Sequence, residues 1–558
     1  MKTSLLRRVL AGLALSLAGV GAASALPAQF IIVNINAAGV GFNDPTPAAP
    51  VGGNTGTTLG EQRQIAFTHA ASIWSARLDS DVPIRIRAQF VPLGAGVLGS
   101  AGPVSVVRDF PNAPLGATWY HVALANALAG VDLIPTGDDI NANFSTNFPF
   151  YLGIDNQAPP GQPDLVAVLL HEFAHGLGFS QFASLTTGNL FNGFPDVYNS
   201  RLFDSAQGLH WPQMTSAQRL VSATSFGRVV WSGANVTANV PDVLVFGSPE
   251  VNVTSPPAIA GAYQFGTAAF GPPVGSPNVA AQVVAAVDAV EAGGTSTDGC
   301  SPFDNAAAIA GRIALIERGL CAFAVKARNA TNAGAAGAII YNNAANVNAA
   351  PPGLGDDGIN GAFVTIPTVS VRRADGLSIV AQLGGGVTAS IGVNDAIRAG
   401  ADALGRARVY APFPVVGGSS ISHYDSVARR NLLMEPSINS DLTHLVKSPF
   451  DLTWELFRDI GWTFPDADGD GYPDDEDCNP GSIVTATIVV GGIDTGVPNT
   501  VHAGGCTSSD LIAEAKSEAK NHGGYVSAVA HLTNGWVLEG LINGGQKGSI
   551  QSAVARDN

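Results

Sequence analysis

Residues 169–182, LLHEFAHGLGFSQF, constrain this chain more strongly than any other stretch. His171 and His175 are four residues apart, so on a helix both imidazoles project from one face toward a single point. Glu172 follows the first histidine and can reach a water molecule bound there. The pattern is typical of a catalytic zinc helix whose glutamate is the general base of peptide hydrolysis. The alternative is a chance match on an ordinary buried helix.

The flanking residues predict the helix itself. Asp164 can cap its amino end, and Leu165 and Val168 begin an apolar stripe. Gly176 and Gly178 can end it. We therefore expect a short buried helix that carries both histidines.

A catalytic zinc normally has three protein ligands and one open position. The short form of this motif has a third histidine where the present chain has Gln181, a poor zinc ligand. The third ligand must therefore come from elsewhere. The remaining histidines are the candidates: His69, His121, His210, His423, His444, His502, His522 and His531.

Two segments, HEFAHGLGF and the distant SHYDSVARRNLLMEP, resemble the leishmanolysin-type metzincin proteases. In that family an insertion separates the zinc helix from the third histidine, and a methionine turn follows that histidine. The resemblance implies that His171, His175 and His423 bind zinc, that Glu172 is the base and that Met434 is the turn methionine. It implies a core formed by residues 26–240 and 396–465. Met434 could also simply fill core space.

Other ligands stay open. His210 is nearer in sequence but has no methionine turn after it, and His444 lies ten residues beyond Met434. Asp425 could bind the metal, although we expect it to orient His423 or to cap a turn. A glutamate on a later helix is a further possibility.

Residues 241–395 are too long an insertion to be a loop and should form a domain. The pattern over 311–343 predicts a strand at 313–316, a helix at 322–333 and a strand at 338–341. This stretch, with IPTVSV at 366–371, resembles a protease-associated domain. The resemblance implies a non-catalytic lid or a substrate-recruiting module.

An acidic segment at 466–480, DADGDGYPDDEDCNP, provides carboxylates at the spacing that calcium loops use. The expected ligands are Asp466, Asp468, Asp470, Asp474 and Asp477. The segment resembles a thrombospondin type 3 repeat; the alternative is a solvated acidic linker. Residues 481–558 predict a small helical unit, with one helix from about 508 that ends at the glycines 523 and 524.

Four cysteines suggest two disulfides in an exported chain, and Cys300–Cys321 with Cys478–Cys506 is the simplest of three pairings.

Residues 1–25 have the charged start, apolar run and small-residue end of a signal peptide. We expect a secreted protein with no membrane insertion after the signal is removed. A net charge of -16 argues against nucleic acid as a partner.

Further patterns predict a helix at 61–78, a closing helix at 452–462 and an edge strand at 138–148 that lines the substrate cleft. The sequence thus predicts an α+β multidomain protein. A metzincin-like zinc protease core is interrupted by a protease-associated α/β domain and followed by a calcium loop and a small helical tail. The expected function is zinc-dependent endopeptidase activity on protein or peptide substrates. The alternative is a non-catalytic, calcium-dependent adhesin or matrix-binding protein on a protease-like fold.

Overall fold

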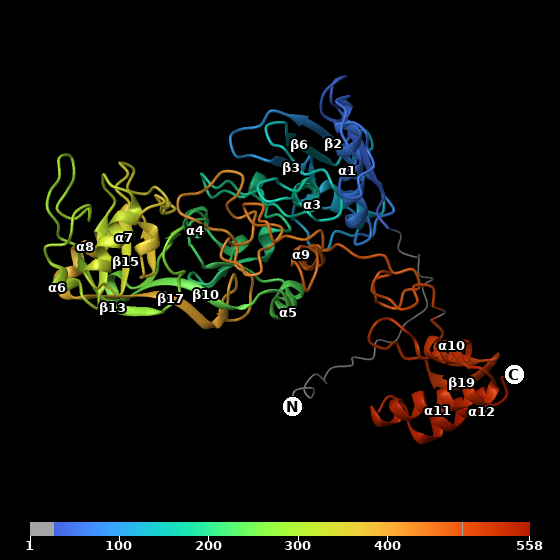
Figure 1. Cartoon of the computed structure of the whole chain (residues 1–558). Coiled ribbons are helices and arrows are strands. Elements are labelled where there is room, and N and C mark those ends of the chain that lie inside the picture. Colours follow the sequence, from blue (N-terminus) through green and yellow to red (C-terminus); the bar gives the residue numbers. More distant parts are fainter. Residues whose placement is uncertain (1–26, 483, 558) are drawn as a thin grey trace. The chain divides into compact units, whose positions relative to one another are not determined.

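The computed structural model describes residues 27–482 and 484–557, so the expected signal peptide at 1–25 lies outside the described residues. The chain divides into two compact units, of which one spans Ala28–Thr463 and the other contains the chain from Phe464 onward (Figure 1). None of the described helices is long and apolar enough to cross a membrane. The molecule is a mixed α/β multidomain protein.

The amino-terminal part of the first unit is a four-stranded sheet covered by helices. Its strand order is β1-β2-β6-β3, in which β1, β2 and β6 are parallel and β3 is antiparallel. The elements are β1 (Phe30–Asn34), α1 (Leu59–Ser75), β2 (Ile84–Val91), β3 (Gly99–Pro103), β4 (Val106–Val107), β5 (Tyr120–His121), α2 (Val122–Ala129), β6 (Ile140–Ser145) and α3 (Leu165–Leu177).

The prediction of an edge strand at 138–148 is wrong. The strand there, β6, lies between β2 and β3 and is therefore internal. The edge strand on this side of the sheet is β3, whose sequence GSAGP is too small and glycine-rich to show the apolar alternation of a strand. The β6 strand has the pattern INANFS, in which alternate residues are buried.

Helix α3 is the expected zinc helix, and every residue in it is buried. The Asp164 side chain accepts from the backbone N–H groups of Val166 and Ala167, as predicted for its amino-terminal cap. Gly176 lies inside the helix rather than beyond its end. A Cβ on Gly176 would lie 2.4 Å from a methyl carbon of Ile140, so glycine here lets α3 approach β6 closely.

Helices α1 and α3 pack together over an aromatic cluster. The Phe67 ring of α1 lies 5.4 Å from the Phe173 ring of α3 and 4.9 Å from the Phe144 ring of β6. Trp74 donates from Nε1 to the Leu170 carbonyl. Burying large side chains of this kind stabilises the core by about 1.5–3 kcal/mol each, and here it fixes the helix that carries the histidines.

The remainder of this core lies on both sides of a long insertion in the chain. Before it come β7 (Leu202–Asp204), β8 (Leu209–His210), α4 (Ser216–Ser222), β9 (Val229–Trp231) and α5 (Ala234–Val243), and after it comes α9 (Thr453–Ile460). The α9 residue Asp459 accepts from the Trp231 indole and from the Asn235 backbone. Trp462 donates to the Leu177 carbonyl at the end of α3. These bonds attach the closing helix to segments that lie far before it in the sequence.

The insertion forms an eight-stranded sheet with the order β11-β10-β17-β13-β14-β15-β16-β12. Its elements are β10 (Phe246–Ser255), β11 (Gly261–Ala262), β12 (Gly266–Thr267), β13 (Val279–Ala285), α6 (Ala306–Ile309), β14 (Ile313–Glu317), α7 (Phe323–Asn332), β15 (Gly337–Tyr341), β16 (Thr368–Val371), α8 (Arg373–Gln382) and β17 (Val387–Arg398). The strand–helix–strand pattern expected within 311–343 is present as β14, α7 and β15.

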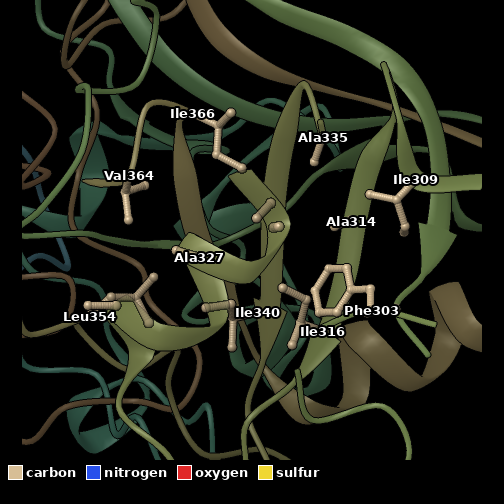
Figure 2. Close-up of a cluster of buried hydrophobic side chains, with 14 of the residues drawn as sticks. Phe303, Ile309, Ala314, Ile316, Ala327, Ala335, Ile340, Leu354, Val364 and Ile366 are labelled. Carbon is tan, nitrogen blue, oxygen red and sulfur yellow. The ribbon is translucent and has the colours of Figure 1, made fainter. Parts of the chain in front are cut away.

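One face of this sheet packs against α7 through a buried apolar cluster. Figure 2 shows Ile316 of β14 and Ile340 of β15 in this cluster with Ala327 of α7. Buried alanines at 324, 327 and 330 give α7 a small face toward the sheet. A second apolar cluster includes Ile313, Leu315 and Ile339, which alternate along the same strands with the first set.

The two ends of the insertion lie side by side. Phe246 at the start of β10 pairs with Arg398 at the end of β17, and Ala399 donates from its backbone to Val245. The chain therefore returns to the place where it left the core. This pairing closes the insertion at 246–398, so that residues after 400, among them His423, can pack against α3.

The unit from Phe464 onward holds the acidic loop, a hairpin of β18 (Thr487–Val490) and β19 (Ile493–Pro498), and three helices. The helices are α10 (Ser508–Glu518), α11 (His522–Leu538) and α12 (Gly544–Val554). The prediction that Gly523 and Gly524 end a helix is wrong, because both lie in the first turn of α11. The Asn521 side chain caps α11 by accepting from the Gly524 N–H.

Both disulfides form with the simplest pairing. Cys300 is joined to Cys321 within the insertion, and Cys478 to Cys506 within the carboxy-terminal unit. No cysteine is left free in the described chain.

Candidate metal centre

Three histidines from two distant segments of the chain meet in the core of the first unit. The Nε2 atom of His171 lies 3.2 Å from Nε2 of His175 and 3.2 Å from Nε2 of His423. All three imidazoles are buried. The structure thus brings together the three residues that the sequence analysis proposed as ligands.

A backbone carbonyl fixes the far nitrogen of each ring. His171 donates from Nδ1 to the Leu433 carbonyl, His175 to Phe179 and His423 to Ser419, each at 2.8 Å. A carbonyl accepts only from a protonated nitrogen, so Nδ1 bears the hydrogen and Nε2 carries a lone pair. The three lone pairs therefore face one another.

This arrangement fits a metal ion. Burial lowers the pKa of His171 to about 4 and that of His175 to about 3, and it lowers the pKa of His423 as well. The imidazoles are therefore neutral near pH 7 and able to bind a cation. Three neutral imidazoles with their outer nitrogens held by hydrogen bonds form the donor set of catalytic zinc sites.

Glu172 lies beside the three histidines and against the edge strand. It is buried, and burial raises the pKa of its carboxyl to about 8, while a hydrogen bond from the Ala101 backbone acts in the opposite direction. A Cβ on Gly99 would lie 2.8 Å from the Glu172 carboxylate oxygen Oε1. Glycine at 99 thus leaves room for the carboxylate next to β3.

The role of β3 was missed by the sequence analysis. Strand β3 pairs with β6 on one side, and among the described residues no strand pairs with its other side. Its open edge therefore runs past Glu172. The small residues of VLGSAGP give a weak strand signal, and only the glycine at 99 could have indicated a close approach.

The sequence also did not predict the backbone carbonyls that orient the histidines. Every residue has such a carbonyl, so the residue type does not show which one accepts. Leu433 is the partial exception, since it directly precedes Met434. Met434 is fully buried, and its carbonyl accepts from the Tyr424 N–H, next to His423. The segment expected as a methionine turn thus contacts the metal centre through its backbone.

The alternative ligands lie elsewhere. His444 bonds from Nε2 to Asp164 at 3.0 Å, and the His210 ring packs against Phe203. Asp425 does not orient His423, because Nδ1 of His423 bonds to the Ser419 carbonyl. The Asp425 carboxylate accepts instead from the Val427 N–H in a turn. None of these residues belongs to the histidine cluster found among the described residues.

Two further residues lie close to the centre without joining it. Gln181, where the short motif has its histidine, donates from its backbone N–H to Ser422, the residue before His423. His121 is fully buried, and its Nε2 lies 2.8 Å from the Ser180 hydroxyl. Gln181 thus holds the loop that follows α3 against the segment that carries His423, and His121 holds the same loop against β5.

The acidic loop forms a second cluster of a different kind. Carboxylate oxygens of Asp466, Asp468 and Asp470 lie within 4.8 Å of one another, and all three side chains are partly exposed. Asp474 and Asp477 do not join them: Asp474 accepts from the Ala467 N–H and Asp477 from the Asn479 N–H. The structure therefore groups three of the five expected calcium ligands.

Comparison with known proteins identifies the insertion. Residues 279–379 match the family model of the PA domain. The match lies inside the sheet of β10 to β17 and confirms the protease-associated domain expected from the sequence.

The matching curated relatives cover only short stretches. An aminopeptidase of Pseudomonas aeruginosa is 54% identical over 65 residues, which are 12% of this chain and 12% of that protein. The human ER degradation-enhancing alpha-mannosidase-like protein 3 is 57% identical over 44 residues, 8% of this chain and 5% of that protein. The chain thus spans a small fraction of the relatives that it matches.

Solved structures give likenesses over a larger share of the chain. A zinc aminopeptidase from Bacillus subtilis is 22% identical, with a TM-score of 0.21, over 28% of this chain and 36% of that one. A subtilisin-like protease from Pseudoalteromonas sp. AS-11 is 21% identical, with a TM-score of 0.20, over 27% of this chain and 34% of that one. Each of these likenesses covers 28% of this chain or less, so the function has to be argued from the histidine cluster.

Proposed function

We propose that this protein is a secreted zinc-dependent peptidase of the metzincin kind that cleaves internal peptide bonds. His171, His175 and His423 would hold the zinc, and Glu172 is the general base. The observation that carries the proposal is the convergence of three buried Nε2 atoms, each ring being fixed at Nδ1 by a backbone carbonyl. Such fixed donors cost no reorganisation when they bind a cation.

Zinc held by three imidazoles would polarise a water molecule and the substrate carbonyl. Glu172 takes a proton from that water at a carboxylate oxygen, and the water oxygen forms a bond to the carbonyl carbon. Glu172 then returns the proton to the amine nitrogen as the carbon–nitrogen bond breaks. Burial alone raises the pKa of Glu172 to about 8, and the charge of a cation at the three histidines would lower this pKa and favour the ionised carboxylate that a base needs.

The open edge of β3 supports an extended substrate. A peptide can add to this edge by backbone hydrogen bonds, which places a bond of the peptide beside Glu172. The edge strand offers no group that demands a free amino terminus. We therefore favour cleavage within a chain over removal of its first residue.

Aminopeptidase activity is the second candidate, because the relative from Pseudomonas aeruginosa bears that name. The two activities differ in their response to a blocked substrate. An endopeptidase cleaves an amino-terminally acetylated peptide as well as the free peptide, whereas an aminopeptidase cleaves only the free one.

The test combines metal analysis with these two substrates on the purified full chain. We expect stoichiometric zinc, casein hydrolysis and equal cleavage of the free and acetylated peptides. Hydrolysis of the free peptide alone would favour the aminopeptidase. Full zinc occupancy without hydrolysis of any of these substrates would contradict peptidase function.

Secretion and calcium binding stay predictions. The two disulfides support an oxidising compartment, as in exported proteins. The grouping of Asp466, Asp468 and Asp470 supports a weak calcium site at extracellular concentrations of the ion. The role of the PA domain in recruiting substrate is likewise a proposal.

A further inference from the structure

The carboxy-terminal unit contains a large groove. Its volume is about 1020 Å³, and its walls are α10, α11 and the loop at 502–506. Small-molecule pockets usually have volumes of about 300–1,000 Å³, so this groove is at the upper end of that range. The Cys478–Cys506 disulfide lies in its wall.

The groove has an apolar floor built from two helix faces. Leu511 and Ala515 lie four residues apart along α10, and Ala519 follows directly after the end of that helix. Across from them, Ala528 and Leu532 follow at the same interval along α11, and the stripe continues through Gly535 and Trp536. Because most of these side chains are small, the backbone of a bound segment can approach both helices closely.

The rim of the groove is acidic. Glu514 and Glu518 are one helical turn apart on α10, and Glu539 lies at the end of α11. All three are exposed. The residues that line the groove, all of them in the described part of the chain, include no lysine or arginine.

Of the two histidines in the lining, His502 and His531, the first does not offset this charge. The His502 ring stacks on Trp536 at 5.2 Å, and burial lowers the pKa of His502, with Glu539 acting in the opposite direction. His502 is therefore neutral near pH 7. Lys516, which lies on α10, pairs with Asp557 and is not part of the lining.

We propose that this groove binds a basic amphipathic helix of a partner protein. Apolar side chains of the helix would fill the floor between α10 and α11, and its lysines or arginines would face Glu514, Glu518 and Glu539. Binding of one helix face in a groove between two others needs apolar anchors at intervals of three and four residues, which matches the spacing of the floor.

Apolar surface continues beyond the groove at the carboxyl end of α11. Leu538 is 89% exposed and Leu541 is 43% exposed, on either side of the rim residue Glu539. Exposed leucines beside a groove extend the surface that a partner helix can cover. The site therefore accommodates a helix longer than the cavity itself.

The test measures binding of a designed probe to the full chain. The probe is a fluorescently labelled peptide of about 16 residues that forms an amphipathic helix. Its leucines lie on one face and its lysines on the other. The triple variant Glu514→Gln, Glu518→Gln, Glu539→Gln keeps side-chain size and removes three charges. We expect fluorescence anisotropy to show binding that is weakened about 10-fold or more by the triple substitution and also by high salt.

A matched variant separates this site from the general negative charge of the protein. Asp81→Asn, Asp304→Asn and Asp395→Asn together remove the same charge from exposed positions in the other unit. This variant should bind the peptide as the unsubstituted protein does. Equal weakening by the two triple variants would overturn the proposal.

Two more measurements decide the nature of the occupant. A peptide in which glutamate replaces every lysine should bind at least about 10-fold more weakly than the basic peptide. Equal binding would mean that the groove takes any apolar helix and would overturn the charge assignment. Sedimentation that shows a dimer of the full chain, dissociated by Ala528→Arg, would identify a second copy as the occupant and overturn the proposal.

Discussion

The histidine cluster and the aspartate cluster each bring together three side chains of a metal-ligating type, but the surroundings of the two clusters differ. In the histidine cluster of the first unit, each ring is held by a carbonyl from a separate segment, and the donor atoms face one another without another partner. In the aspartate cluster of the second unit, the carboxylates already accept from the loop's own backbone. Asp466 accepts from Gly469 and Gly471, for example.

The difference shows what makes a cluster ready for a metal. The fold has positioned the imidazoles, so a metal gains three donors and displaces no hydrogen bond to Nε2. The carboxylates of the aspartate cluster already accept from backbone amides, although Oδ2 of Asp470 has no partner. A cation must therefore compete with these amides and with water at a partly exposed site. We therefore expect tight zinc binding at the first cluster and weak calcium binding at the second.

The largest expected effect follows from removing one imidazole. His423→Ala should lose zinc and peptidase activity together. The affinity should fall more than about 100-fold, since even the loss of an outer hydrogen bond costs 10–100-fold. Metal analysis after dialysis measures the change. His210→Ala is the matched control and should keep stoichiometric zinc; full occupancy in His423→Ala would mean that another residue is the third ligand.

Substitution of Glu172 should lower the catalytic rate and leave zinc binding unchanged. Glu172→Gln keeps the shape of the side chain beside Gly99 but cannot accept a proton. We expect kcat to fall by about 100-fold or more, with zinc content unchanged. Initial rates on a quenched-fluorescence peptide measure this effect. Activity near that of the unsubstituted protein would exclude Glu172 as the base.

The aspartate cluster should respond to calcium on a smaller scale. At millimolar calcium, a site with a Kd of about 10⁻⁴–10⁻³ M stabilises its unit by about 1 kcal/mol. The melting temperature of the carboxy-terminal unit should rise by several degrees, and Asp470→Asn should reduce the rise. Calorimetry of the full chain with calcium and with a chelator provides the measurement. An unchanged transition would show that the acidic segment is a linker.

The smallest effect concerns how rigidly α3 presents its histidines. Asp164→Ala removes the cap of α3 and should lower the free energy of unfolding by about 1 kcal/mol. Thr215→Ala removes the cap of α4 at a similar cost. Only the first should weaken zinc binding, by no more than about fivefold. Denaturant unfolding and zinc titration of both variants test this, and equal zinc affinity would show that the fold holds α3 without its cap.

Much of the candidate site could be predicted because it is local. The spacing of His171 and His175 and the cap at Asp164 depend only on helix geometry, so the sequence indicated both. The acidic loop is local as well, and three of its five expected ligands cluster. The continuous apolar runs of β14 and β15 and the helix between them likewise indicated the inserted domain.

Local rules failed where two conformations were equally compatible with the residues. The run AKNHGG can end one helix or begin the next, and the Asn521 cap decided in favour of the second. Strand β3 has too little side chain to show alternation, so its backbone pairing with β6 could not be read from its pattern.

The sequence alone therefore determined the helix with His171, Glu172 and His175, the PA domain and the acidic loop. Each is specified by residues that lie near one another in the sequence. The tertiary structure decided how His423 reaches the zinc helix, which strand forms the open edge and which carbonyls fix the rings. The reason is that these depend on β10 pairing with β17 and on contacts between segments some 250 residues apart, as between His171 and Leu433, which are separated by 262 positions.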